Sequence, residues 1–155
     1  MPYYKLQPSS LIKTYAVEGP TTSTSGVLTA NNIYLGTIQI LYGVSLTGIR
    51  FYKGATAAGN VLVGLYDSSG NLLASSNSTA LSGTFAVQSV PFTATYFANP
   101  GIYFLGFIPS TSSDTFALTA SFGLSSTAAA GGFSLPSTVT PPANGGAYIP
   151  QLSTY

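Results

Sequence analysis

The sequence predicts an all-β fold, a jelly-roll-like β-sandwich of about eight antiparallel strands with extended N- and C-terminal arms. Glycine and proline, 17 and 10 of the 155 residues, interrupt the chain at short intervals, as turns between strands require. The apolar segments between them are short and rich in β-branched and aromatic residues, which strands prefer. The sequence has no repeat of solenoid period, so closure of two sheets is the simplest arrangement.

The length of 155 residues suits one domain. We divide the chain into an extended N-terminal arm, residues 1–26, and a β-sandwich domain, residues 27–155, whose last part, residues 133–155, is rich in proline. No apolar run is long enough for a transmembrane helix, and the N-terminus lacks the apolar stretch of a secretory signal. We therefore expect no membrane partner.

The first half of the sandwich domain contains five strand-like segments, and its turns are clear. Gly48 separates apolar residues that would lie on opposite faces, with Leu46 on one and Ile49 on the other, which predicts a β-bulge. Asp67–Asn71 is typical of a hairpin loop in which Gly70 takes a positive φ and the aspartate holds the turn. The predicted strands are Val27–Thr29, Ile33–Leu41, Val44–Tyr52, Asn60–Tyr66 and Leu72–Ser75.

The second half continues this pattern. Pro91 is expected to break the ladder between two strands because it lacks an N–H, and Asn99–Gly101 predicts a type II turn. Ile102–Ile108 is the longest apolar run and predicts the central core strand. The other predicted strands are Phe85–Val90, Phe92–Phe97, Phe116–Phe122 and Ala147–Ile149, with a small-residue loop at Gly123–Gly132 and a free or docked tail at Pro150–Tyr155.

The composition excludes several classes of function. Histidine and cysteine are absent, which removes the usual general base, the thiol nucleophile and the preferred ligands of zinc and copper. The net charge of +1 comes from four cations and three acids, too few for a nucleic-acid surface. A hydrolase of wall sugars would have to pair two of Glu18, Asp67 and Asp114, and nothing in their spacing brings two together. We predict a protein that is not an enzyme and has no cofactor, metal or nucleic-acid partner.

Two groups of residues are candidates for binding. Arg50 and Lys53 flank two aromatic residues, an arrangement that we interpret as an exposed strand face rather than as a base- or sugar-stacking site. The proline-rich arm can add to the sheet edge of a neighbour, with anchors at Tyr3, Tyr4, Leu6, Leu11 and Ile12. Tyrosines near strand ends could instead stack on a glycan, namely Tyr42, Tyr52, Tyr66 and Tyr96.

Three stretches carry a family resemblance: Thr47–Gly54 (TGIRFYKG), Leu65–Asn71 (LYDSSGN) and Phe92–Gly106 (FTATYFANPGIYFLG). Together they resemble a β-sandwich module of tailed-bacteriophage virion proteins, which include capsid decoration (cement) proteins and tail-fibre parts. The resemblance covers about residues 33–122. It rests on turns and aromatic residues, and it includes no catalytic residues.

The resemblance implies a non-enzymatic structural role in the virion. A single module with an N-terminal arm is most similar to a decoration protein, which binds the outer capsid surface and stabilises the head. The implied partners are the major capsid protein and further copies of the chain, as a homotrimer. The alternative is a tail-fibre or spike component that binds host receptor glycans.

Overall fold

The computed structural model describes residues 24–120, 125–143 and 148–155. These residues form strands and no helix, which confirms the predicted all-β class. The described part of the chain accordingly contains no helix that could cross a membrane. The strands are β1 (Thr24–Val27), β2 (Asn32–Ile40), β3 (Val44–Tyr52), β4 (Asn60–Tyr66), β5 (Leu72–Ser75), β6 (Thr79–Ala80), β7 (Val87–Ala98), β8 (Gly101–Pro109), β9 (Thr115–Ala120), β10 (Ser125–Ala129), β11 (Tyr148–Pro150) and β12 (Leu152–Thr154).

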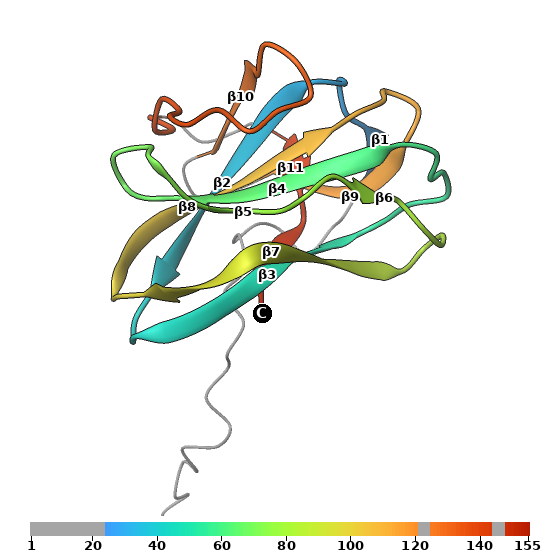
Figure 1. Cartoon of the computed structure of the whole chain (residues 1–155). Helices are drawn as coiled ribbons and strands as arrows, with labels where there is room; N and C mark the ends of the chain where they lie inside the picture. The colour runs from blue at the N-terminus through green and yellow to red at the C-terminus, as the bar shows by residue number, and fades with distance from the viewer. Residues whose placement is uncertain (1–23, 121–124, 144–147) are drawn as a thin grey trace, which may run out of the picture.

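The strands form a two-layer antiparallel sandwich (Figure 1). One layer is the main sheet, with the order β10-β2-β8-β4-β5 and with β6 paired to β4. The second layer combines two three-stranded sheets, β12-β3-β7 and β1-β9-β11. A bridge between Lys53 and Phe116 and a hydrogen bond from Gly54 N to Thr115 O (2.8 Å) join these two sheets.

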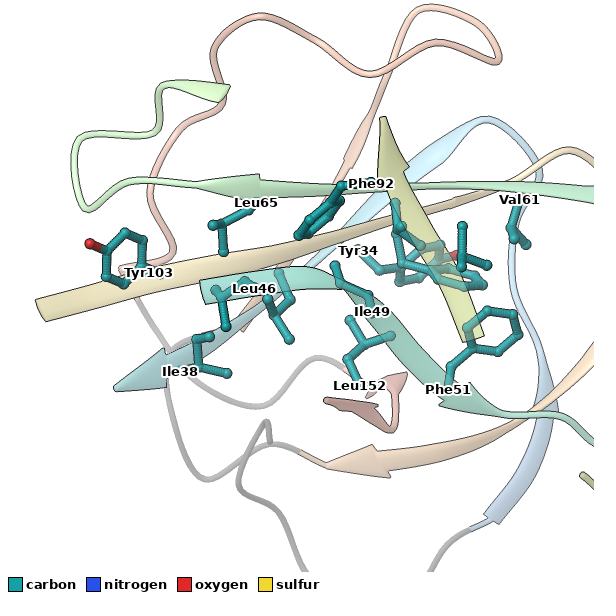
Figure 2. Close-up of a cluster of buried hydrophobic side chains, with 14 of the residues drawn as sticks. Tyr34, Ile38, Leu46, Ile49, Phe51, Val61, Leu65, Phe92, Tyr103 and Leu152 are labelled. Atoms are coloured by element: carbon teal, nitrogen blue, oxygen red, sulfur yellow. The ribbon is translucent and has the colours of Figure 1, made fainter. Parts of the chain in front are cut away.

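The inner core lies between the two layers. Alternation along each strand places every second side chain in this space, so Val61, Val63 and Leu65 of β4 all contribute to it. Figure 2 shows residues of β2, β3, β4, β7, β8 and β12 converging there. Phe51, Phe107 and Phe116 pack edge to face with ring centroids 5.0–6.0 Å apart, a favourable arrangement for aromatic rings.

The main sheet also buries its outer face, against residues 130–139 rather than against a third sheet. Ile33, Leu35, Leu62, Tyr66, Phe104 and Ile108 form this outer core. Gly64 and Gly106 pair in adjacent strands and leave room for the Tyr66 ring, which would lie 2.7 Å from a Cβ at Gly106. The proline-rich residues 133–143 therefore form a cover over the sheet, where the sequence predicted an extended arm.

Several predicted elements are confirmed. The bounds of β3, β4 and β5 agree with the predicted ranges, and β8 is the central strand, between β2 and β4. Gly70 has a φ of 88° in the β4–β5 hairpin. The register of β3 against β7 shifts between Leu46 and Gly48, as the predicted bulge requires.

Two details of β3 and β7 differ from the prediction. Ile49 and Phe51 do not face away from Leu46, because the bulge resets the alternation and all three side chains enter the inner core. Pro91 does not break β7, which runs without interruption from Val87 to Ala98. Pro91 pairs with Gly48 at the bulge, in the outermost strand of its sheet, and such positions tolerate the missing N–H.

The C-terminal third differs more. The predicted loop Gly123–Gly132 contains β10, which pairs with β2, and the predicted tail contains β12, which pairs with β3. Gly101 has no positive φ and begins β8 after a passage from one layer to the other, so the type II turn is wrong. Short strands such as these bring the number above the expected eight.

The sandwich has two ends, and different loops connect the strands at each end. We name the ends after Tyr42, which precedes β3, and Tyr52, which is its last residue. The Tyr42 end holds the turns at 41–43, 67–71 and 99–100, on the left of Figure 1. The Tyr52 end holds the loops at 53–59, 81–86 and 110–114, on the right. The nine residues of β3 separate the ends by about 30 Å.

Candidate functional site

The described surface of the protein carries almost no charge. Four charged side chains lie in the described residues, and two of them, Lys53 and Asp114, are fully buried. The other two, Arg50 and Asp67, are partly exposed and opposite in sign. Arg50 lies 4.6 Å from the centre of the Tyr155 ring, a cation–π contact. Recognition by this surface must therefore depend on apolar contact and neutral hydrogen bonds.

Buried charges fix the loops of the Tyr52 end. The Asp114 carboxylate accepts hydrogen bonds from Ala58 N (2.5 Å), Gly59 N (3.2 Å) and Thr111 Oγ1 (2.6 Å). The Lys53 ammonium donates to the carbonyls of Ser82 (3.1 Å) and Gly83. Lys53 is thus part of the interior and not of an exposed strand face, contrary to the prediction.

The electrostatics of this cluster agree with a structural role. Burial lowers the pKa of Lys53, and the charge of Asp114 partly offsets this effect. No buried polar side-chain atom of the described residues lacks a hydrogen-bond partner. Both charges therefore hold backbone groups of neighbouring loops in place and are not presented to solvent.

Asp67 holds the β4–β5 hairpin, as predicted. Its carboxylate accepts hydrogen bonds from Asn71 Nδ2 (2.9 Å), Asn71 N (2.8 Å) and Ser69 N (2.9 Å). These bonds, the one from the Asn71 side chain first, lower the pKa of Asp67. Asp67 and Asp114 lie at opposite ends of the seven-residue β4, about 20 Å apart, and cannot act as a catalytic pair. Glu18 lies outside the described residues.

A small hollow at the Tyr52 end is lined by two aromatic residues. It has a volume of about 140 Å³ and is lined by Ser25, Tyr52, Gly54, Phe85 and Ala117. Phe85 is 64% exposed and Tyr52 is 37% exposed. The Tyr52 hydroxyl donates a hydrogen bond to Phe85 O (2.9 Å), so the two residues are fixed relative to each other. We refer to this place as the Tyr52–Phe85 hollow.

The Tyr42 end also exposes large apolar side chains. Tyr42 is 62% exposed and Phe97 is 59% exposed. The Phe97 ring lies over Gly43, where an added Cβ would come within 2.8 Å of it. Leu41, in the same turn as Tyr42, and Ile102, near the start of β8, are also exposed at this end. Exposed apolar groups gathered in this way are typical of contact surfaces.

The tyrosines predicted to stack on glycans have different environments. Tyr42 and Tyr52 are exposed at opposite ends, whereas Tyr96 is half-buried against the inner core. Tyr66 is fully buried, and its hydroxyl donates to Pro136 O (3.1 Å). Burial raises the pKa of Tyr66. The prediction is therefore wrong for Tyr66, which supports the outer core and cannot meet a ligand from solvent.

The predicted anchors of the arm, Tyr3, Tyr4, Leu6, Leu11 and Ile12, lie outside the described residues. No group of three or more acidic residues able to hold a metal ion occurs among residues 24–120, 125–143 and 148–155. Phe85 was not identified from the sequence, which places it at the start of a predicted strand. The available signal was the Ser82–Gly83 dipeptide shortly before it, because Ser-Gly pairs mark turns and loops.

A larger groove lies on the main-sheet side, between β10 and the proline-rich cover. It has a volume of about 620 Å³, with Ile33 and Leu35 at its base and residues 126–131 and 136–143 along its walls, Ser137 excepted. Small side chains and prolines form these walls, so the described lining of the groove has no charged group with which to bind a ligand. It lies beside an outermost strand of the main sheet.

The comparisons with known proteins identify a family without a known activity. The family model described as "Domain of unknown function (DUF4082)" matches residues 20–154, and the chain belongs to this family. The search of curated proteins found no match, and neither did the search of solved structures.

Proposed function

We propose that the protein is a non-enzymatic structural component of a bacteriophage particle, a capsid decoration protein that binds the outer capsid surface and stabilises the head. The observation that carries this proposal is the pair of apolar ends, about 30 Å apart, on a described surface with only two partly exposed charges. A rigid body with an adhesive surface at each end suits a bridge between neighbouring subunits. The phage assignment depends on the sequence resemblance alone.

The physical argument concerns many weak contacts acting together. Burying Tyr42 and Phe97 against a neighbour removes apolar surface from water without separating charges from solvent. Each contact adds a modest stabilisation, but a shell carries many copies, and linked contacts open far less often than single ones. The partners in this proposal are the major capsid protein and further copies of the chain in a homotrimer.

The proposal is tested on particles with and without this protein. Particles that lack it should release DNA at a lower temperature, measured by a dye that reports released DNA. Re-addition of the wild-type protein should restore the release temperature, whereas a Tyr42→Ser, Phe97→Ser double variant should bind at lower occupancy. Thr93→Ala, an exposed change on β7 between the ends, is the matched control. Equal release temperatures with and without the protein would contradict the proposal.

A tail-fibre or spike component that binds host receptor glycans is the second candidate. The exposure of Tyr42 and Tyr52 favours it, because exposed aromatic rings stack on sugars. Adsorption to host cells separates the two roles. Saturable binding of the isolated protein to cells, together with unchanged DNA release from particles that lack it, would favour the receptor-binding role.

A further inference from the structure

Phe85 has a strained backbone that folding alone does not explain. Its φ is 47°, in the left-handed region that bulky residues rarely adopt. The side chain is 64% exposed, so burial does not compensate for the strain. Glycine would adopt this conformation without a steric penalty. A large aromatic residue kept in such a conformation is a feature typical of functional sites.

The surrounding structure holds Phe85 in this conformation from both sides. Phe85 N donates to Gly54 O (2.9 Å), Tyr52 Oη donates to Phe85 O (2.9 Å), and Lys53 N donates to Ala86 O (2.9 Å). The buried Lys53 ammonium also binds the carbonyls of Ser82 and Gly83. The loop that presents Phe85 is therefore fixed before any ligand arrives, which lowers the entropy cost of binding.

The lining of the Tyr52–Phe85 hollow indicates the chemistry of its ligand. Two aromatic side chains supply apolar faces, while Ser25 and Tyr52 supply hydroxyl groups. None of the described residues that line the hollow is charged, and the ammonium of the adjacent Lys53 is directed to carbonyls in the interior. An ionic ligand would lose hydration here without gaining a partner, so a neutral ligand is favoured.

The size of the hollow limits the ligand further. Its volume of about 140 Å³ is well below the roughly 300–1,000 Å³ of sites that enclose drug-sized molecules. One six-membered ring matches this space. A sugar ring combines an apolar C–H face, which packs on aromatic rings, with hydroxyl groups that can bond to Ser25. We infer that the Tyr52–Phe85 hollow binds one neutral sugar ring of a glycan.

This site does not depend on the place of the protein in a virion. A decoration protein could use it to attach particles to surface polysaccharides, and a fibre component could use it to recognise a receptor. Failure of glycan binding would leave the bridging proposal unchanged, because bridging needs apolar contacts at the two ends and no glycan.

The test is a glycan array that contains neutral and acidic oligosaccharides, followed by titration calorimetry with the neutral glycan that gives the strongest signal. We expect binding to at least one neutral glycan. Phe85→Ala should weaken it tenfold or more, because the stacking ring is lost, and Phe85→Tyr should restore it. Tyr52→Phe keeps its ring but loses the hydrogen bond to Phe85 O and should have a smaller effect.

Phe97→Ala is the matched control, because Phe97 is a similarly exposed phenylalanine, 59% against 64%, at the opposite end. It should bind with wild-type affinity. Three results would each overturn the inference: no binding to any neutral glycan, a preference for acidic glycans, or an equal loss of affinity in Phe85→Ala and Phe97→Ala. Circular dichroism of each variant verifies that the loss of a largely exposed ring leaves the fold intact.

Discussion

The two ends of the sandwich expose similar aromatic residues but are constructed differently. At the Tyr42 end, short turns connect the strands, Asp67 holds its hairpin at the surface, and Phe97 rests on Gly43. At the Tyr52 end, longer loops converge on the fully buried Lys53 and Asp114, and Phe85 has a strained backbone. The carboxylate of the first end binds residues within four positions of Asp67, whereas that of the second binds backbone groups up to 56 residues from Asp114.

The two ends therefore suit different tasks. Exposed rings on a turn and at the end of β7 suit a broad adhesive contact, for which position matters less than area. A ring held by buried charges beside a hollow suits recognition of a defined ligand, for which position is decisive. Both ends can adhere to a neighbour, as the proposed function requires, but only the Tyr52 end has the sugar site. The following substitutions test that contrast.

The largest effect is expected from removing the buried carboxylate of the Tyr52 end. Asp114→Ala leaves Gly59 N and Ala58 N without their acceptor and should lower the free energy of unfolding by about 3 kcal/mol. Asp67→Ala, at the Tyr42 end, removes bonds that water can replace and should cost about 1 kcal/mol. Urea unfolding measures both. An equal loss of unfolding free energy in the two variants would show that the carboxylates at the two ends contribute equally to stability.

A second effect concerns the Phe85 loop. Lys53→Met leaves the carbonyls of Ser82 and Gly83 without their donor and Asp114 without a nearby positive charge, so the free energy of unfolding should fall by about 2 kcal/mol. The loop should open more often, and chymotrypsin should cleave after Phe85 about tenfold faster. Mass spectrometry of the fragments measures this rate. Unchanged cleavage after Phe85, with Phe97 as the internal reference, would contradict the role given to Lys53.

The smallest effect separates the two exposed phenylalanines. Phe85→Gly relieves the strain of a positive φ and should stabilise the fold by about 0.5–1 kcal/mol, while abolishing glycan binding. Phe97→Gly, in the strand β7, should destabilise it by about 0.5–1 kcal/mol. Thermal unfolding of both variants provides the measurement. A loss of stability in Phe85→Gly would mean that the residue has a structural role and that its conformation is not a cost of function.

Local sequence was sufficient for the elements with strong periodicity and clear turns. The strands β3, β4 and β5 and the hairpin held by Asp67 lie where the sequence placed them, because alternating apolar residues and an Asp…Gly turn determine them locally. Local sequence was insufficient to predict β10 and β12. β10 consists of small or polar residues, and β12 has a single large apolar residue, Leu152, so neither shows an alternating apolar pattern. They become strands because β2 and β3 offer edges with which they pair.

The site was predicted only in part, for the same reason. The sequence indicated Tyr52 as a ring near a strand end, but it did not separate the exposed Tyr52 from the buried Tyr66, since both are tyrosines at the ends of strands. The cover formed by residues 133–143 buries Tyr66 but not Tyr52, and Pro136 O accepts a hydrogen bond from the Tyr66 hydroxyl. Phe85 and the interior position of Lys53 were missed, since both depend on loops that meet only in the folded chain.

Composition, turn residues and the alternation of side chains are local properties, so the amino-acid sequence was enough to predict a sparsely charged all-β domain. Which aromatic residues reach solvent, and which of the few charges enter the interior, depends on the folded chain. The physical reason is that burial and hydrogen-bond partners come from segments distant in sequence. Lys53 and Asp114 illustrate this dependence. The backbone groups that bind Lys53 lie at least 29 residues away, and those that bind Asp114 lie at least 55 residues away. The Thr111 side chain is the nearby partner of Asp114.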